Sequence, residues 1–418
     1  MSHSQEARST VTVVHGRSSS PVSGEEVLMR SAQAIGVVFL PEPRPETEAL
    51  FLYVAHAFAA GENRQADDQD DAERNDHDRK DRPEHPPEAY DLRMATTDAL
   101  LSLDDVYRAR ERIGGRVHRT PLLTSATLSK QVGADVRFKA ELLQRTGSFK
   151  PRGVLNKLAT LTDEEKQRGV ISISAGNHAQ ALAYASAVEA IDALVVMWQT
   201  ASPMKIAAAR GYGATIDTEA PDIPAAFERL EELIESTGRT LVHPYDDPLV
   251  MAGQGTVGLE MLEDAPETDV VLVQVGGGGL VSGIATAVKG MNPGVRVVAV
   301  EPERSPALHE SLKAGEPVTV EAKSIADGLN GPYAGANCVR VCTDLGVESV
   351  LVTEEALQEA FRFMYSRMKL ACEVAGAATA AALMTGAVEL EPGQTVAAVV
   401  SGGNVAPKTA VAILASEQ

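Results

Sequence analysis

The sequence has few cysteines, few aromatic residues and no long apolar run. Its three cysteines, Cys338, Cys342 and Cys372, are too few for a disulfide framework and lack the CxxC spacing of a zinc site. A reducing cytoplasm is therefore the expected compartment. No apolar segment reaches the roughly 18 residues that a membrane-spanning helix needs. Residues 1–30 lack a basic start followed by an apolar stretch, so no secretion signal is expected.

Basic charge is also scarce, with 38 Lys and Arg residues against 58 Asp and Glu residues and a formal net charge of −20. Charge of this sign argues against nucleic acid and anionic membranes as main partners. Hydrophobic residues make up 44% of the 418 residues. A chain of this size and composition can build two domains or one large two-lobed domain.

Residues 1–93 differ in character from the rest. Between Gly61 and Leu92 there are 12 acidic and five basic residues and almost nothing to bury. Such a segment cannot offset the entropy of its own ordering, so we predict a mostly disordered, low-complexity N-terminal extension. The abrupt change at Met94 suggests a second hypothesis, that Met94 is the true start of the protein.

From Ser102 onward the pattern becomes regular. Ser102 and Asp105 have the spacing of a helix capping box, and Gly114 ends the apolar helical pattern that follows. Short β-branched runs then alternate with Ala- and Glu-rich helical segments, which predicts a parallel sheet covered by helices on both faces. Strands are expected at 136–140, 170–174, 193–198, 214–217, 270–275, 295–300 and 396–401, and helices at 152–160, 178–188, 204–211, 223–236, 280–289 and 354–369.

Lys150 lies in the run Thr-Gly-Ser-Phe-Lys and is followed by Pro151. Gly147 permits a tight backbone approach, and Phe149 places an aromatic face beside the amine. Because proline suits the first turn of a helix, we expect Lys150 at a junction just before a helix. A lysine held in this way and partly stripped of water can lose its proton and react with a carbonyl. A lone lysine is more often an ordinary surface residue, so the other motifs must decide.

Four consecutive glycines, Gly276, Gly277, Gly278 and Gly279, follow a predicted buried strand and precede an apolar helix that starts at Leu280. Backbone amides in such a turn can close around a phosphate at the positive end of the helix. A flexible linker would not stand between a core strand and an apolar helix. The run fits neither GxGxxG nor the P-loop, which disfavours a dinucleotide or ATP site.

Two further strand ends carry polar residues. The run Ser174-Ala-Gly-Asn-His178 precedes an Ala-rich helix, whose first amides could bind a carboxylate. Asn177 could donate a hydrogen bond to a phenolate-like oxygen. Ser401 begins the run Ser-Gly-Gly-Asn404 and could bond a ring nitrogen. Taken alone, His178 reads as a structural residue and Ser401 as part of a turn.

Together these motifs make residues 94–407 resemble the threonine dehydratase and serine dehydratase/racemase family, pyridoxal-phosphate (PLP) enzymes of fold type II. The matching runs are those around Lys150, Ser174 and Gly276, followed by Ile-Ala-Asp-Gly328, Glu373-Val-Ala-Gly-Ala and Ser-Gly-Gly-Asn404. The resemblance implies a two-lobed α/β fold of mostly parallel twisted sheets flanked by helices. The large PLP-binding lobe would comprise 94–168 and 250–418, and the small carboxylate-binding lobe 169–249.

The resemblance also implies a role for each matched residue. Lys150 would carry PLP as a Schiff base and remove the Cα proton. The substrate carboxylate would lie on Ser174, Ala175, Gly176, Asn177 and His178. The other cofactor contacts would be Phe149 against the ring, Asn177 on the ring hydroxyl, Gly276, Gly277, Gly278, Gly279 and Leu280 at the phosphate, Ser401 on the ring nitrogen, and Gly328 and Glu373 lining the pocket.

The implied reaction is β-elimination of L-threonine or L-serine to a 2-oxo acid and ammonia. A neutral serine at the ring nitrogen leaves the ring a weaker electron sink, which suits elimination better than transamination. The alternatives are a serine racemase, a lyase for another β-hydroxy amino acid such as hydroxyaspartate, or a PLP- or amino-acid-binding module without catalysis. Ala175 stands where racemases of the family carry a second serine, which disfavours racemisation.

Other features concern metal, regulation and assembly. Glu301 matches one ligand of the metal-dependent relatives, whereas Ala307 stands where their acidic ligand is expected, so a divalent cation is disfavoured. Because the chain ends soon after Asn404, feedback control by isoleucine is not expected. The resemblance further implies a homodimer or homotetramer.

Overall fold

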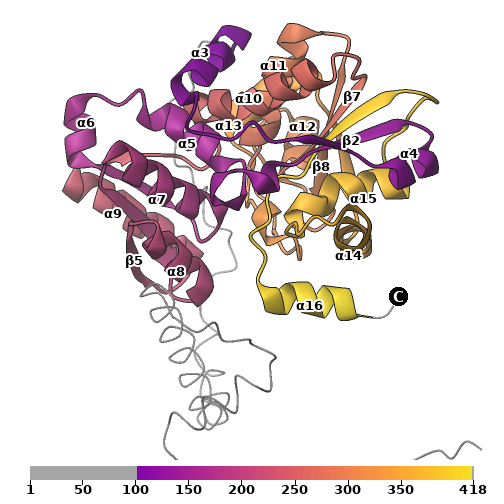
Figure 1. Cartoon of the computed structure of the whole chain (residues 1–418). Coiled ribbons are helices and arrows are strands. Elements are labelled where there is room, and N and C mark those ends of the chain that lie inside the picture. The colour runs from indigo at the N-terminus through magenta and orange to yellow at the C-terminus, as the bar shows by residue number, and fades with distance from the viewer. Residues whose placement is uncertain (1–100, 417–418) are drawn as a thin grey trace, which may run out of the picture. The chain divides into compact units, whose positions relative to one another are not determined.

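The computed structural model describes residues 101–416, which form two β-sheets flanked by helices. The predicted disordered extension, residues 1–93, and the proposed start at Met94 lie outside the described residues. In Figure 1 the strands labelled β2, β7 and β8 belong to the larger, six-stranded sheet, and the strand labelled β5 belongs to the smaller, four-stranded sheet. The sequence prediction of an α/β fold is confirmed.

The larger sheet is parallel except at one edge, where β1 pairs with β2 in antiparallel orientation. Its central strand β7 is buried on both faces, as a parallel sheet covered by helices requires. The strands in spatial order are β1 (Leu122–Thr124), β2 (Asp135–Lys139), β10 (Thr395–Val399), β7 (Val270–Gln274), β8 (Arg296–Pro302) and β9 (Glu348–Val352).

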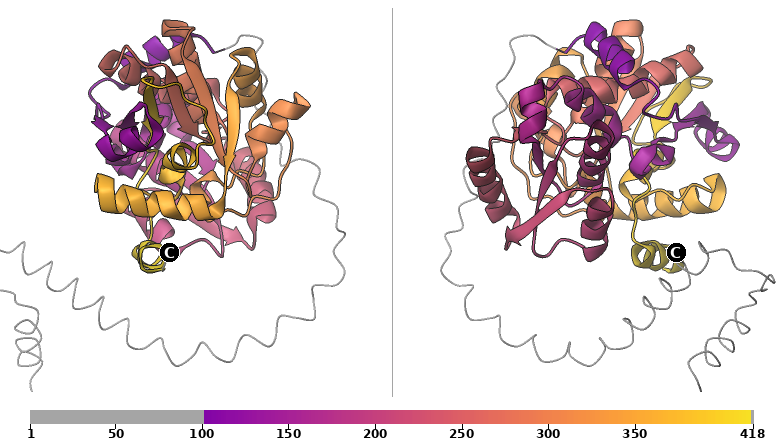
Figure 2. Two further views of the ribbon diagram at one scale, coloured as in Figure 1. Left: turned by 90° about the vertical axis from the view of Figure 1, so that its right-hand side faces the viewer. Right: turned by 60° about the vertical axis from the view of Figure 1, so that its left-hand side comes forward.

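Alternate residues of these strands pack into two separate cores. Val270 and Leu272 face the core that α14 and α15 cover, whereas Val271 and Val273 face the core that α10 and α11 cover. Figure 2 shows these helix layers from two further directions. The helices around the larger sheet are α3 (Leu103–Ile113), α4 (Ala126–Val132), α10 (Pro248–Asp264), α11 (Gly279–Met291), α12 (Ala307–Ala314), α13 (Ala336–Asp344), α14 (Glu354–Phe363), α15 (Ala378–Thr385) and α16 (Pro407–Ala415).

The smaller sheet is entirely parallel. Residues of α5 and α7 pack on one of its faces, and α9 covers the other. The strands in spatial order are β5 (Thr215–Ala220), β4 (Ala193–Trp198), β3 (Val170–Ile173) and β6 (Thr240–Leu241), and the helices are α5 (Lys150–Leu158), α6 (Asp163–Arg168), α7 (Asn177–Glu189), α8 (Pro203–Gly211) and α9 (Ile223–Thr237).

Within the described residues, no helix is long and apolar enough to cross a membrane. Short helical turns complete the described elements. The 3₁₀ turns are η1 (Glu141–Leu143), η2 (Arg145–Gly147), η3 (Asp327–Leu329) and η5 (Ala375–Ala377), and a π-helical turn, η4, spans Met364–Met368.

The predicted capping box is present, because Ser102 Oγ accepts from the Asp105 amide and Asp105 accepts from the Ser102 amide at 3.0 Å. Two helix predictions need correction. Helix α5 begins at Lys150 itself, with Pro151 as its second residue, so Lys150 does not precede the helix. The helix predicted at 354–369 ends at Phe363 and continues as the π turn.

Candidate active site

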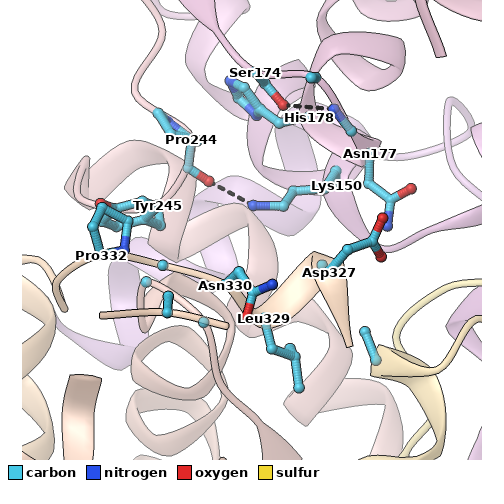
Figure 3. Close-up of a pocket in the computed structure, with 18 of the residues that line it drawn as sticks. Lys150, Ser174, Asn177, His178, Pro244, Tyr245, Asp327, Leu329, Asn330 and Pro332 are labelled. Atoms are coloured by element: carbon cyan, nitrogen blue, oxygen red, sulfur yellow. Dashed lines mark hydrogen bonds between the residues drawn. The ribbon is translucent and has the colours of Figure 1, made fainter. Parts of the chain in front are cut away.

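A cavity of about 740 Å³ opens at the carboxyl ends of strands from both sheets. Its wall includes Ile173 and Trp198 from the smaller sheet and Gln274 and Ser401 from the larger one. Ligands of open parallel sheets bind at this end of the strands. Figure 3 shows Lys150 between a segment that carries Ser174 and His178 and the loop around Asn330.

Lys150 projects into this cavity from the first turn of α5. Its Nζ donates a hydrogen bond to the backbone carbonyl of Pro244 at 2.7 Å and lies 5.1 Å from the centroid of the Phe149 ring. Burial lowers the pKa of the amine to about 8, and the charges of Cys338 and Glu373 oppose this shift. A substantial fraction of the amine is therefore neutral near physiological pH, as a nucleophile or base requires.

The first turn of α7 forms the second part of the cavity wall. Ser174, Ala175, Gly176 and Asn177 all line the cavity, and no side chain caps the helix. The Ser174 hydroxyl instead accepts from the Gly176 amide at 3.1 Å. The amides at the positive end of this 13-residue helix have no side-chain partner, and such a helix start can accept a carboxylate.

His178 is buried in the same turn of α7. Its Nε2 lies 3.0 Å from both the Ser172 hydroxyl and the Val242 carbonyl. Burial, with a smaller contribution from the Lys150 charge, lowers the imidazole pKa to about 3, so the ring is neutral at physiological pH. Because the Val242 carbonyl can only accept, we assign the proton to Nε2.

The Asn177 side chain is fixed by two partners that lie far from it in sequence. Its Nδ2 donates to Glu373 Oε1 at 2.8 Å, and its Oδ1 accepts from Asn404 Nδ2 at 2.8 Å. Asn404 also donates to the Thr146 carbonyl at 2.7 Å. Burial raises the pKa of Glu373 to about 7. Four of the predicted motifs are thus joined by hydrogen bonds at one point of the site.

Gly276, Gly277 and Gly278 lie in the turn between β7 and α11, and Gly279 is the first residue of α11, one residue before the predicted start at Leu280. All four glycines line the cavity. Gly278 has φ +99°, a left-handed conformation that favours glycine, and a Cβ there would lie 2.7 Å from Cys338 Cβ. No side chain caps α11, which leaves its first amides open to a ligand. Leu280, predicted beside this turn, also lines the cavity.

Ser401 follows β10 and lies beside Gln274 at the end of β7. With its amide oriented to match its neighbours, Gln274 accepts from the Ser401 amide at 2.9 Å and from the Ser401 hydroxyl at 2.8 Å. Gly328 completes the set of predicted residues, and a Cβ there would lie 3.1 Å from Ala375 Cβ and 3.6 Å from Glu373 Oε1. The structure therefore brings the predicted cofactor and carboxylate residues to one cavity.

Several site residues were not identified from the sequence. The Pro244 carbonyl accepts a hydrogen bond from the Lys150 amine. The Tyr245 ring packs against Gly277 so closely that a Cβ on Gly277 would lie 2.3 Å from two atoms of the ring. Lys205 and Asp327 form an ion pair that joins α8 to η3 at the cavity wall. No sequence motif marks a backbone carbonyl, and ion pairs between distant segments cannot be read from spacing.

Glu301, the metal candidate, lies outside this cavity wall. It is buried at the end of β8, where its two oxygens accept from the amides of Leu308 at 2.8 Å and His309 at 2.7 Å. Burial raises the Glu301 pKa to about 8. Residues 101–416 contain no group of three or more His, Cys, Asp or Glu side chains placed to hold a metal ion.

Comparisons with known proteins agree with this geometry. The family model described as "Pyridoxal-phosphate dependent enzyme" matches residues 113–402. The chain is 42% identical over 308 residues to L-threonine ammonia-lyase of Thermotoga maritima, which covers 73% of this chain and 76% of the relative. It is 38% identical over 313 residues to the catabolic L-threonine dehydratase TdcB of Escherichia coli K12, which covers 74% of this chain and 95% of the relative.

Solved structures give the same result. Threonine deaminase of T.th. superposes with a TM-score of 0.69 at 43% identity, and the match covers 73% of this chain and 99% of that one. Serine racemase from Dictyostelium discoideum superposes with a TM-score of 0.70 at 37% identity, covering 74% and 100%.

Proposed function

Because the chain belongs to the pyridoxal-phosphate dependent enzyme family, we propose that it is a PLP-dependent ammonia-lyase acting on L-threonine or L-serine. The products would be a 2-oxo acid and ammonia. The observation that carries this proposal is a single cavity that holds a deprotonatable lysine amine, an uncapped glycine turn and an uncapped helix start.

The residues of the cavity fit PLP. The glycine turn offers open amides to a phosphate, and side chains at Gly276 or Gly278 would meet Leu329 or Cys338. Lys150 offers an amine for the aldehyde. Ser401 offers a neutral hydroxyl at the cavity wall, bonded to Gln274.

When bound, PLP supplies an aldehyde that links to the substrate amine and a conjugated ring that withdraws electrons from Cα. Lys150 then acts as the general base, because burial places its pKa within reach of the working pH and its neutral form can accept the Cα proton. The Pro244 carbonyl accepts a hydrogen bond from Nζ and so holds the amine in one orientation.

Other residues bind and orient. The open amides at and just before the start of α7, those of Ala175 and Asn177, hold the substrate carboxylate, since the Ser174 amide donates to the Val196 carbonyl. Asn177 is held by Glu373 and Asn404 so that it can bond the ring hydroxyl. We assign the phosphate to the glycine turn and the ring nitrogen to Ser401. Ala175 brings no acid–base group to the wall, which supports elimination over racemisation.

The arrangement also suggests how the protein works as a whole. We assign 94–168 and 250–418 to the cofactor-binding lobe and 169–249 to a smaller lobe that closes on the substrate. We further propose that the protein acts in the cytoplasm, which its three unpaired buried cysteines support. We also propose that it is a homodimer or homotetramer, which the family resemblance supports.

The test is an assay of the purified chain with PLP against L-threonine, L-serine and 3-hydroxyaspartate, measuring 2-oxo acid and ammonia together. We expect stoichiometric 2-oxo acid and ammonia from threonine or serine. An inverted amino acid with no 2-oxo acid would contradict the lyase proposal in favour of a racemase. Lys150→Ala is expected to abolish turnover, and unchanged turnover would exclude Lys150 from the chemistry.

A further inference from the structure

A cluster of four charged side chains is buried at the start of α5, and none of the four lines the cavity. Arg152 and Lys139 are fully buried, as is Glu141, and Glu260 is nearly so. Two cations face two carboxylates, so the cluster is electrically balanced. Burying four charges is costly, and such clusters often serve to fix a geometry more than to add stability.

Arg152 uses its guanidinium to join three segments of the chain. It donates to both oxygens of Glu141 in η1 at 2.8 Å, and to both oxygens of Glu260 in α10 at 2.7 and 2.9 Å. It also donates to Thr256 Oγ1 at 3.1 Å and to the His118 carbonyl at 3.2 Å. A planar fork with five N–H donors can make these six contacts together when one N–H is shared between two acceptors, and an ammonium group cannot.

Further contacts continue along the two helices, which run antiparallel. The Gly153 amide donates to the Gln254 side chain at 3.2 Å, and a Cβ on Gly153 would lie 2.6 Å from the Val250 carbonyl. Asn156 Nδ2 donates to the Leu249 carbonyl at 2.6 Å. These contacts fix how far α5 is shifted along α10. Later residues of α5 contact earlier residues of α10, as expected for antiparallel helices.

The Lys150 hydrogen bond links α5 to the segment that leads into α10. Lys150 is the first residue of α5, and Pro244 lies four residues before the first residue of α10, Pro248. The 2.7 Å contact between the Lys150 amine and the Pro244 carbonyl therefore depends on how α5 sits on α10. Along α5, Arg152 is the anchor nearest to Lys150, two residues away, whereas Asn156 holds the end of α10 that is nearer to Pro244.

We propose that Arg152 is a positioning residue for the Lys150 amine, holding α5 on α10 so that the amine stays enclosed against the Pro244 carbonyl. The inference rests on the proposed function, since it concerns the amine that would hold PLP. The Arg152 side chain bonds no residue of the cavity wall, and only its backbone amide does so, by donating to the Phe149 carbonyl at 3.1 Å. The guanidinium therefore acts through the helix that it fixes.

The surroundings of Lys150 make this role measurable. Burial lowers the amine pKa to about 8, and the charges that act on it come from Cys338 and Glu373. Besides burial, the charge of the Lys150 amine in turn lowers the pKa of two imidazoles, His178 and His243, which are neutral at physiological pH. Because Arg152 is not among these groups, a change in the Lys150 pKa on its replacement reports displacement of the amine.

The experiment measures covalent attachment of PLP to Lys150 in the full-length chain after dialysis to remove cofactor. Samples are quenched with borohydride at intervals and the labelled Lys150 peptide is quantified by mass spectrometry from pH 6 to pH 10. For the wild type we expect a half-maximal rate near pH 8. For Arg152→Lys we expect the midpoint to rise by about one pH unit, with attachment about tenfold slower at pH 7.

Two further variants make the result decisive. Leu128→Ala removes a fully buried side chain of α4 and is expected to lower thermal stability without moving the pH midpoint. Asn156→Ala removes a milder α5–α10 contact and should move the midpoint in the same direction by less, and it decides the matter if Arg152→Lys does not fold. Midpoints equal to the wild type in Arg152→Lys and Asn156→Ala would overturn the inference. A wild type that never attaches PLP would contradict the proposed function instead.

Discussion

Asn177 donates through Nδ2 to Glu373 Oε1 over 2.8 Å, joining the first turn of α7 to the segment just before η5. The two residues are 196 positions apart in sequence, and each belongs to a different motif of the candidate site. Burial raises the Glu373 pKa to about 7, and the bond to Asn177 lowers it only in part. The protonation of one carboxyl group therefore affects the amide that we assign to the ring hydroxyl.

Glu373→Gln is predicted to change how stability depends on pH. A carboxyl whose pKa rises from 4.5 to about 7 on folding binds more protons in the folded state, so its effect on stability becomes less favourable as pH rises from 4.5 to 7. The free energy of unfolding of the wild type, relative to Glu373→Gln, should fall by about 3 kcal/mol over this range. Urea unfolding of both proteins at pH 5 and pH 8 measures it; a constant difference would refute the assignment.

Gly278→Ala is predicted to weaken PLP binding. The residue has φ +99°, and its Cβ would lie 2.7 Å from Cys338 Cβ, so the turn must move and its amides with it. We expect the PLP dissociation constant to rise at least about tenfold, a loss of about 1.4 kcal/mol. Fluorescence titration with PLP measures the constant. Gly315→Ala, at another left-handed glycine with open space around it, serves as the control and should leave PLP binding unchanged.

Lys205→Met is predicted to raise KM more than it lowers kcat. The Lys205–Asp327 ion pair joins α8 to η3 at the cavity wall, and both side chains are partly exposed. Such a pair is weak and sensitive to salt. Added salt should raise the wild-type KM for threonine and leave that of the variant nearly constant. Equal salt dependence in both proteins would show that the pair does not affect substrate binding.

The parts of the fold predicted from sequence were those governed by local patterns. Strand β7 is a run of β-branched residues followed by glycines, so its buried position and the turn after it could both be inferred. The same reasoning found the strand ends at Ser174 and Ser401. The two preceding strands, β3 and β10, belong to different sheets, so the rule that carboxyl ends of parallel strands meet at one edge could not by itself bring these two ends to one cavity.

Helix α10 was missed because its sequence argues against a helix. It contains Gly253, Gly255 and Gly258, which lower helix propensity. The structure explains them: a Cβ on Gly253 would lie 2.4 Å from the Arg152 carbonyl, and one on Gly255 2.7 Å from the Gly283 carbonyl. Close packing against α5 and α11 requires these glycines, and such a requirement is visible only after the fold is known.

The buried charges were missed for a similar reason. Arg152 follows Lys150 closely, yet nothing in the sequence pairs it with Glu141 and Glu260, which lie 11 and 108 positions away. The role of the Pro244 carbonyl could not be predicted either, because every residue has a backbone carbonyl. Local spacing thus predicts which residues line a site, while the contacts that hold them come from long-range packing.

The most direct test of the whole account is to identify the residue that PLP modifies. The full-length chain is incubated with PLP, reduced with borohydride, digested and analysed by mass spectrometry, with Lys150→Ala as the matched control. The account predicts that the phosphopyridoxyl group is found on Lys150 in the wild type and that specific labelling is lost in the variant. Labelling of another lysine, or equal labelling of both proteins, would contradict it.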